Sequence, residues 1–174
     1  MTDLILFNPH AGNGTAGRET RNLSKMLLGD SLKYQDMTEI DDYAKLFAGL
    51  DPETRIILSG GDGTFNRFIN DTEGLNIPNE IYYYATGSGN EFIKSFGADG
   101  KAFHDLEALV SGDIQDLDYM ESDCGICLNM FSVGVDARVA DGMQKYKRIP
   151  LLAGRASYHL STVESILRGI AQPY

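Results

Sequence analysis

Three glycine-rich turns, each directly after a strand-like run, constrain the fold of this chain more than any other feature. The runs are Leu4–Phe7, Arg55–Ser59 and Ile81–Tyr84, and the turns that follow them are Asn8–Gly12, Gly60–Thr64 and Gly87–Asn90. Short apolar runs bounded by turn residues are typical of strands that are buried on both faces of a sheet. Apolar residues at helical spacing follow the turns, so the repeating unit is strand, tight turn and helix.

This repeating unit predicts the fold class. Helices are expected over 17–28 and 41–50, with a weak strand over 32–36 between them. Strands that alternate with helices of about ten residues form a mostly parallel sheet through right-handed crossovers, with helices on both faces. We therefore predict an α/β fold of three layers. Because ligands bind at the carboxyl ends of parallel strands, the three turns should lie together at one edge of the sheet.

The pattern of the chain changes after about Ser111. The expected elements there are strands over 114–119 and 126–131, with no helix between them, and helices over 135–147 and 154–168. We therefore predict one domain over residues 1–112 and the beginning of a second, β-rich domain over residues 113–174.

Composition excludes several classes of partner. Twenty-five acidic and fifteen basic residues give a formal net charge of −10, which repels nucleic-acid phosphates, so nucleic acid is not an expected partner. No apolar run approaches the roughly 18 residues of a membrane-spanning helix, and the N-terminus lacks the basic start of a signal peptide. Cys124 and Cys127 are too few for a disulfide framework. We expect a cytoplasmic protein.

The turn Gly60–Thr64 has the chemistry of an anion site. Its glycines let backbone N–H groups approach phosphate oxygens, and the following helix adds its positive amino end. The Asp62 carboxylate would repel phosphate unless a cation intervened, and Mg²⁺ is held by one or two carboxylates together with phosphates and water. The turn therefore predicts a magnesium–nucleotide site. The alternative is an ordinary turn in which Asp62 and Thr64 cap the following helix.

The three turns together resemble those of the diacylglycerol kinase catalytic domain family, which includes bacterial lipid kinases and sphingosine and ceramide kinases. The matching motifs are Asn8-Pro9-His10-Ala11-Gly12, Gly60-Gly61-Asp62-Gly63-Thr64 and Gly87-Ser88-Gly89-Asn90-Glu91. In that family they form the ATP site of a fold similar to NAD kinase and phosphofructokinase. The resemblance assigns nucleotide contacts to Asn8, Pro9, His10, Ala11, Gly12, Thr38, Gly60, Gly61, Asp62, Gly63, Thr64, Asn66, Gly87, Ser88, Gly89 and Asn90.

The resemblance implies an ATP- and Mg²⁺-dependent lipid kinase. Asp62 would be the catalytic residue, and Asp62, Glu91 and Asp118 would hold Mg²⁺. The implied partners are a lipid with a free hydroxyl and, transiently, a membrane surface touched by 145–152; the prediction leaves room for a homo-oligomer. No residue matches the family's general base, and we expect that base and most of the second domain to lie beyond Tyr174.

The sequence departs from the family pattern at four positions. Ala85 and Ser88 stand where the family has Pro and Thr, and Glu91 stands where it has Asp. Ser88 keeps a hydroxyl and Glu91 keeps a carboxylate. Arg67 reverses the charge of the usual Glu, which alters the electrostatics beside the second turn.

Two alternatives to a lipid kinase remain. Without the general base, the chain could be a non-catalytic nucleotide-binding module. The pattern Gly12-x-Gly14-x-x-Gly17 follows a strand and formally matches the dinucleotide fingerprint, so an NAD kinase-like or dinucleotide-binding protein is the other alternative. That fingerprint does not account for the turn Gly60–Thr64.

Overall fold

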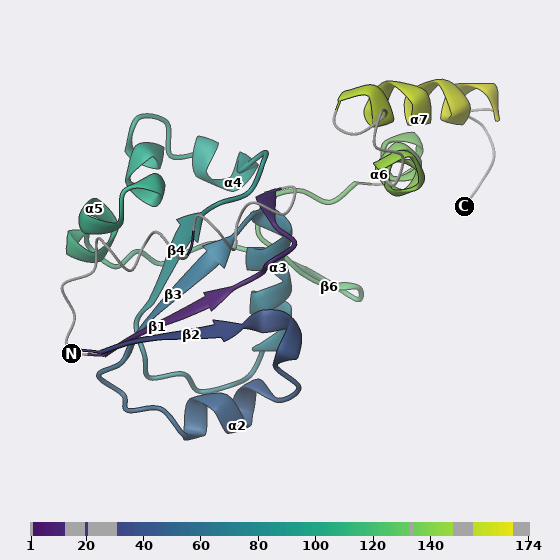
Figure 1. Ribbon diagram of the computed structural model, residues 1–174. Coiled ribbons are helices and arrows are strands. Elements are labelled where there is room, and N and C mark those ends of the chain that lie inside the picture. The colour runs from purple at the N-terminus through teal and green to yellow at the C-terminus, as the bar shows by residue number, and fades with distance from the viewer. Residues whose placement is uncertain (1, 13–19, 21–30, 133, 148–154, 169–174) are drawn as a thin grey trace. The chain divides into compact units, whose positions relative to one another are not determined.

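The computed structural model describes residues 2–12, 20, 31–132, 134–147 and 155–168. These residues belong to two compact units, Met1–Asn129 and Met130–Tyr174. Figure 1 shows the helices and strands of both units.

A parallel sheet forms the centre of the first unit (Figure 1). Its strands lie in the order β2-β1-β3-β4, and their bounds are β1 Thr2–Phe7, β2 Ser31–Asp36, β3 Arg55–Gly60 and β4 Ile81–Ala85. All neighbouring strands pair in parallel. After β1 the chain adds β2 on one side of β1, and it then crosses over to add β3 on the other side of β1. The loops after β1 and β3 therefore diverge at the point where ligands bind in such sheets, and the predicted α/β class is confirmed.

Short helices connect the strands. They are η2 Met37–Glu39, α2 Tyr43–Ala48, α3 Asp62–Asp71, α4 Glu91–Lys94, η3 Asp99–His104 and α5 Leu106–Ser111. The helix expected over 41–50 is confirmed in shorter form: it starts after Asp42, whose carboxylate accepts a hydrogen bond from Lys45 N at 3.0 Å. The helix expected over 17–28 lies outside the described residues except for Thr20.

Alternate residues of the central strands pack on opposite faces of the sheet. On one face Leu6, Ile56 and Leu58 are fully buried with residues of α2, α3 and α4, and on the other Ile57 packs with Leu106 of α5. This two-sided burial is the physical reason why the strands read as continuous apolar runs. The predicted layers on both faces are present.

Aromatic contacts fix α3 on the sheet. Phe65 stacks on Tyr83 of β4 with ring centroids 4.4 Å apart, and it meets Phe92 of α4 edge to face at 5.2 Å. About one helical turn further along α3, Phe68 meets Tyr43 of α2 edge to face, with ring centroids 5.6 Å apart. These contacts set the position of the helix that begins in the second glycine-rich turn.

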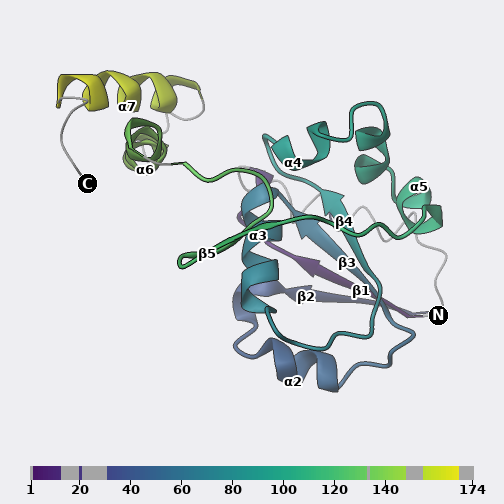
Figure 2. The same cartoon turned by 180° about the vertical axis from the view of Figure 1, so that it is seen from behind.

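A small antiparallel hairpin follows α5 in the sequence and contacts α3 through its second strand (Figure 2). Its strands are β5 Met120–Ser122 and β6 Gly125–Cys127. The predicted strand over 114–119 is wrong, because this segment has no strand partner and its apolar side chains are exposed, with Ile114 at 67%. The strand predicted over 126–131 is reduced to β6. The assignment of 113–174 to a substrate domain stays a prediction.

The second unit contains α6, Val135–Lys147, and α7, Arg155–Leu167, as the sequence predicted within a residue at each end. The two helices pack through small residues, and Ser161 Oγ donates to Val139 O at 2.7 Å. Ser157, Ser161 and Ser165 of α7 are buried, whereas its Val163 and Leu167 are exposed. The described helices include none with the length and apolar character needed to span a membrane.

An ion pair buried at the start of the sheet generates a stability prediction. Asp3 is fully buried, and its carboxylate accepts bonds from Arg55 Nε at 2.7 Å and Nη2 at 3.0 Å. Replacing Arg55 by Met leaves the buried Asp3 carboxylate without its partner. We expect urea unfolding to show a loss of about 3–5 kcal/mol in the free energy of unfolding.

The matched control is Arg67→Met on the surface of α3. Arg67 pairs with Asp71 at 3.1 Å, but its side chain is 79% exposed, so this change should cost about 1 kcal/mol or less. Equal losses for the two variants would contradict the account.

Candidate functional site

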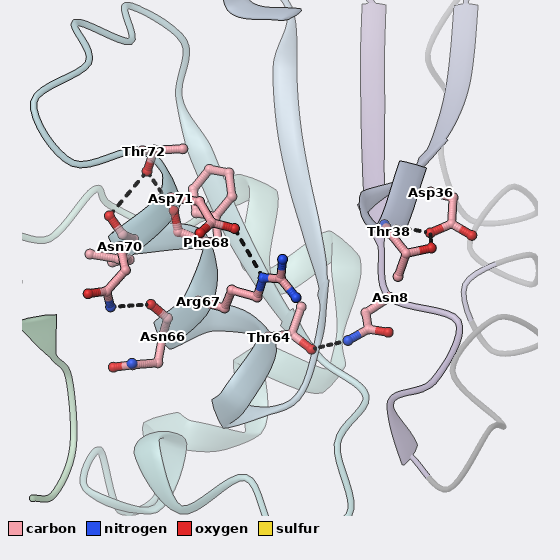
Figure 3. A network of polar contacts seen from close by, with 11 residues as sticks. Asn8, Asp36, Thr38, Thr64, Asn66, Arg67, Phe68, Asn70, Asp71 and Thr72 are labelled. Carbon is pink, nitrogen blue, oxygen red and sulfur yellow. Dashed lines mark hydrogen bonds and ion pairs between the residues drawn. The ribbon is translucent and has the colours of Figure 1, made fainter. Parts of the chain in front are cut away.

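The first two glycine-rich turns meet at the carboxyl edge of the sheet. Asn8 N donates to Ser59 O at 3.2 Å, and Asn8 Nδ2 donates to Thr64 Oγ1 at 3.0 Å (Figure 3). Asn8 follows β1, and Thr64 lies in the first turn of α3, which begins where β3 ends. The Asn8 side chain thus bridges the loops that diverge between β1 and β3.

The second and third turns touch through their glycines. Thr86 N donates to Gly60 O at 2.8 Å. A Cβ placed on Gly87 would lie 2.5 Å from Gly61 Cα and 2.5 Å from Asn90 Oδ1, and one placed on Gly61 would lie 2.9 Å from Gly87 Cα. Neither position tolerates a side chain, so the close approach of the two turns requires glycine at both.

Asp62 ties the second turn to α4. Its Oδ2 accepts a hydrogen bond from Glu91 N at 2.9 Å, and its Oδ1 accepts one from Phe92 N at 3.0 Å. The carboxylate therefore caps a helix that starts 29 residues further along the chain. An ionised carboxylate has about four lone-pair sites, so two bonds leave capacity for a cation.

The amino end of α3 has no side-chain cap. Its N-cap is Gly61, which has no side chain to cap the helix, and among the described residues Asp62 caps α4 while Thr64 Oγ1 accepts from Asn8. Asp62 therefore acts as a cap, but of α4 and not of the following helix as the alternative supposed, and the choice between an ordinary turn and a ligand site stays a prediction. Thr64 N and Phe65 N donate to Gly61 O at 2.9 and 3.0 Å, so among the described residues the N–H groups of Asp62 and Gly63 are left for an external acceptor, and they carry partial positive charge. This end of α3 is chemically suited to bind an anion.

Two further groups border the turns. Tyr83 OH donates to Gly60 O at 3.3 Å. Burial raises the pKa of Tyr83, and the negative charge of Asp62 raises it further, so the phenol is a neutral donor. Asn90 adopts the left-handed conformation with φ 51°, and its Nδ2 donates to Gly87 O at 2.9 Å. Its Oδ1 is buried and has no hydrogen-bond partner among the described residues. An unpaired buried acceptor costs about 1–3 kcal/mol unless a donor reaches it.

A chain of buried hydroxyls lies under the turns, and sequence analysis missed it. Ser59 Oγ is 2.8 Å from Thr20 Oγ1 and 3.4 Å from Thr86 Oγ1. All three residues are buried. The only local signal was Ser59, a polar residue at the end of an apolar run; nothing in the sequence linked it to Thr20.

The remaining predicted nucleotide contacts are placed as follows. Thr38 lies beyond β2, where its N and Oγ1 both donate to Asp36 Oδ1, at 2.8 and 2.7 Å (Figure 3). His10 is exposed, and its N donates to Asn8 Oδ1 at 2.9 Å. The other predicted contact residues also belong to the three turns; they are Pro9, Ala11, Gly12, Gly63, Ser88 and Gly89. Asn66 faces away from the turns and bonds Leu128 N at 3.0 Å.

The three predicted metal ligands are only partly brought together. Asp62 Oδ2 and Glu91 Oε1 both lie 3.8 Å from the Cβ position of Gly89, and Glu91 also pairs with Lys94 Nζ at 2.5 Å. Asp118 lies in the extended segment before β5. In the part of the chain that the structure describes, no group of three or more His, Cys, Asp or Glu side chains could hold a metal ion. The three-carboxylate set stays a prediction.

The fold and the joined turns define a parallel α/β domain with three glycine-rich turns at one edge of its sheet, and comparison with known proteins identifies the family. The model of the diacylglycerol kinase catalytic domain matches residues 3–122. Because this match covers well over half of the chain, the protein belongs to the diacylglycerol kinase catalytic domain family. The resemblance stated from its motifs is confirmed.

Curated relatives from Staphylococcus aureus are named "putative lipid kinase". One from strain MRSA252 is 30% identical over 141 residues, and one from strain N315 is 27% identical over 139 residues. Each alignment covers 80% of this chain but 43% of the relative. The chain therefore spans less than half the length of the relatives that it matches.

Two solved structures of a "putative diacylglycerol kinase" from Bacillus anthracis strain Sterne share the fold. They are 21% identical to this chain, with TM-scores of 0.57 and 0.58. The matches cover 84% and 95% of this chain and 54% and 56% of those chains. At this identity the likeness concerns the fold, which is the NAD kinase-like fold predicted from the sequence.

The contact between Gly61 and Gly87 generates a second prediction. Gly87→Ala forces the two turns apart, and we expect it to lower the free energy of unfolding by about 1–3 kcal/mol and to weaken nucleotide binding. Gly89→Ala is the control in the same turn, because its Cβ would meet only atoms at 3.8 Å. Thermal unfolding of the two variants makes the comparison, and a wild-type Tm for Gly87→Ala would contradict the described turn geometry.

Proposed function

We propose that this chain forms the nucleotide-binding part of a lipid kinase that transfers the γ-phosphoryl group of ATP to a lipid hydroxyl in a Mg²⁺-dependent reaction. Membership of the family supports a kinase, and the names of its relatives support a lipid acceptor. The observation that carries the proposal is the uncapped amino end of α3, which lies between the turns of Asn8 and Gly87.

Several features of the site fit a nucleoside triphosphate. The free N–H groups at the start of α3 suit phosphate oxygens, and Gly61 and Gly87 present backbone without side chains. Asp62 keeps lone pairs for a cation beside those groups. The unpartnered Oδ1 of Asn90 is an acceptor that a donor on the bound ligand would satisfy.

In this proposal the residues of the chain position and neutralise charge. Mg²⁺, when bound, would be held by Asp62 with Glu91 and Asp118 and would neutralise charge that develops on the phosphates. Asn8 holds Thr64 so that the amino end of α3 stays directed at the phosphates. Asp62 fixes the start of α4, which keeps the third turn closed on the second.

A specific observation also favours the non-catalytic alternative. Both oxygens of Asp62 already accept backbone N–H groups of α4. If Asp62 acts only as a cap, the chain would bind nucleotide without transferring phosphate. A direct assay of transfer separates the two functions.

The remaining partner proposals concern the acceptor. A lipid substrate calls for transient contact with a membrane surface, which we proposed from the basic and apolar stretch 145–152. Within it, Lys145 Nζ pairs with Glu164 Oε1 at 3.2 Å, and residues from 148 on lie outside the described residues. Cytoplasmic location and homo-oligomer formation also stay predictions.

The test uses radiolabelled Mg·ATP with mixed vesicles that contain diacylglycerol, a sphingoid base, a ceramide or a polyprenol. We expect one lipid class to be phosphorylated and Asp62→Asn to lower the rate by about 100-fold or more, because the metal loses a charged ligand. Asp62→Asn should also lower the Tm by a few degrees, since the amide accepts only one of the two N–H groups of α4, so transfer rates are compared well below the Tm of both proteins.

Asp71→Asn is the matched control, because Asp71 lies at the other end of α3 and pairs with exposed Arg67. It should transfer at the wild-type rate. Transfer by Asp62→Asn at the wild-type rate would contradict the role of Asp62 in binding Mg²⁺. Nucleotide binding by the wild-type chain without transfer to any lipid would favour the non-catalytic module.

A further inference from the structure

Two asparagines of α3 hold the backbone of β6 and of the residue that follows it. Asn70 Nδ2 donates to Ile126 O at 2.8 Å, and Asn70 Oδ1 accepts from Ile126 N at 2.9 Å. One turn earlier in the helix, Asn66 Oδ1 accepts from Leu128 N at 3.0 Å. The Asn70 amide therefore exchanges both bonds with one residue, as a neighbouring strand would do. We call Asn66 and Asn70 together the asparagine clamp.

The clamp is closely fitted. Asn70 Nδ2 also donates to Asn66 O at 2.8 Å, which fixes the amide against its own helix (Figure 3). Gly125 precedes Ile126 with φ 110°, and a Cβ there would lie 2.5 Å from Asn70 Oδ1. Ile126 is 7% exposed, so these bonds lie in a poorly hydrated contact. Removing the Asn70 amide would leave the N–H and C=O of the buried Ile126 without these partners, and removing the Asn66 amide would do the same to the N–H of the half-buried Leu128.

The clamp also stands between two parts of the chain with different tasks. α3 begins in the turn that contains Asp62, where its free N–H groups form the proposed phosphate site. β6 ends at Cys127, three residues before the second compact unit begins at Met130. The partner strand of β6, β5, is exposed throughout, so the contact with α3 is the main buried support of β6 among the described residues.

We propose that Asn66 and Asn70 are positioning residues that couple the nucleotide site to the segment leading into the second unit. A phosphate bound at the amino end of α3 would stiffen the helix, and the clamp would pass that restraint to Ile126 and Leu128. This inference rests on the proposed function. It gives the Asn66 amide oxygen a bond to Leu128 N, while the nucleotide contact that the family resemblance implied for Asn66 stays a prediction.

The test is amide hydrogen exchange at Ile126 and Leu128, measured by NMR on the whole chain with and without Mg·ATP. In the wild-type protein both amides should exchange slowly, and saturating Mg·ATP should slow them further. Asn70→Ala should speed exchange at Ile126 by about tenfold and abolish the effect of Mg·ATP there. Asn66→Ala should act on Leu128 first. The Kd for Mg·ATP should stay within about threefold of wild type in Asn70→Ala, because that side chain bonds Asn66 O and Ile126 and is not a predicted nucleotide contact.

Two further variants separate coupling from general stability. Asn70→Asp keeps the acceptor for Ile126 N but loses the donor to Ile126 O, so protection at Ile126 should fall only in part. Asn79→Ala is the matched control: Asn79 Nδ2 also holds backbone carbonyls, those of Asp51 at 2.8 Å and Thr54 at 2.9 Å, near the start of β3. Its loss should destabilise the fold but leave the response of Ile126 to Mg·ATP intact.

Three outcomes overturn parts of the account. If Mg·ATP protects amides of the turns but not Ile126 and Leu128, the clamp is structural only and the coupling is wrong, while nucleotide binding stands. If Asn79→Ala abolishes the response as Asn70→Ala does, the response reports overall stability and the coupling is again wrong. If Mg·ATP changes exchange nowhere, the proposed function fails and the coupling fails with it.

Discussion

The carboxylate of Asp62 is the contact on which the arrangement of this site depends. It lies at the first residue of α3, yet it accepts the N–H groups of Glu91 and Phe92 at the start of α4. Because it serves α4, its own helix keeps an amino end that no side chain caps. One carboxylate therefore closes the second turn on the third and leaves the free N–H groups that suit a phosphate.

α3 connects the site to the rest of the first unit. Phe65 packs the helix against Tyr83 of the sheet, and Thr64 receives the Asn8 side chain from the turn after β1. On another side of the same helix, Asn70 holds the backbone of β6. A shift of α3 would therefore disturb all three neighbours at once, which gives a physical reason for treating it as the element that links nucleotide binding to the later part of the chain.

Much of the fold could be predicted from the sequence, because strands buried on both faces leave continuous apolar runs such as that around Ile57, and parallel strands bring their turns to one edge. The contacts within the site could not. Asp62 and Glu91 are 29 residues apart, and Asn66 and Leu128 are 62 apart, so no local periodicity links them. The strand predicted over 114–119 failed for a related reason: a segment of mixed apolar and acidic residues forms a strand only where a neighbouring strand pairs with it.

The most direct test of the central claim, that the joined turns form a magnesium–nucleotide site, is thermal unfolding with Mg·ATP, with ATP plus a chelator, and with NAD at equal concentrations. A ligand at a hundred times its Kd stabilises by about 2.7 kcal/mol, which for a chain of this size raises Tm by about 5–10 °C. The account predicts such a rise with Mg·ATP and a smaller one when the metal is chelated. A rise with NAD and none with Mg·ATP would contradict it.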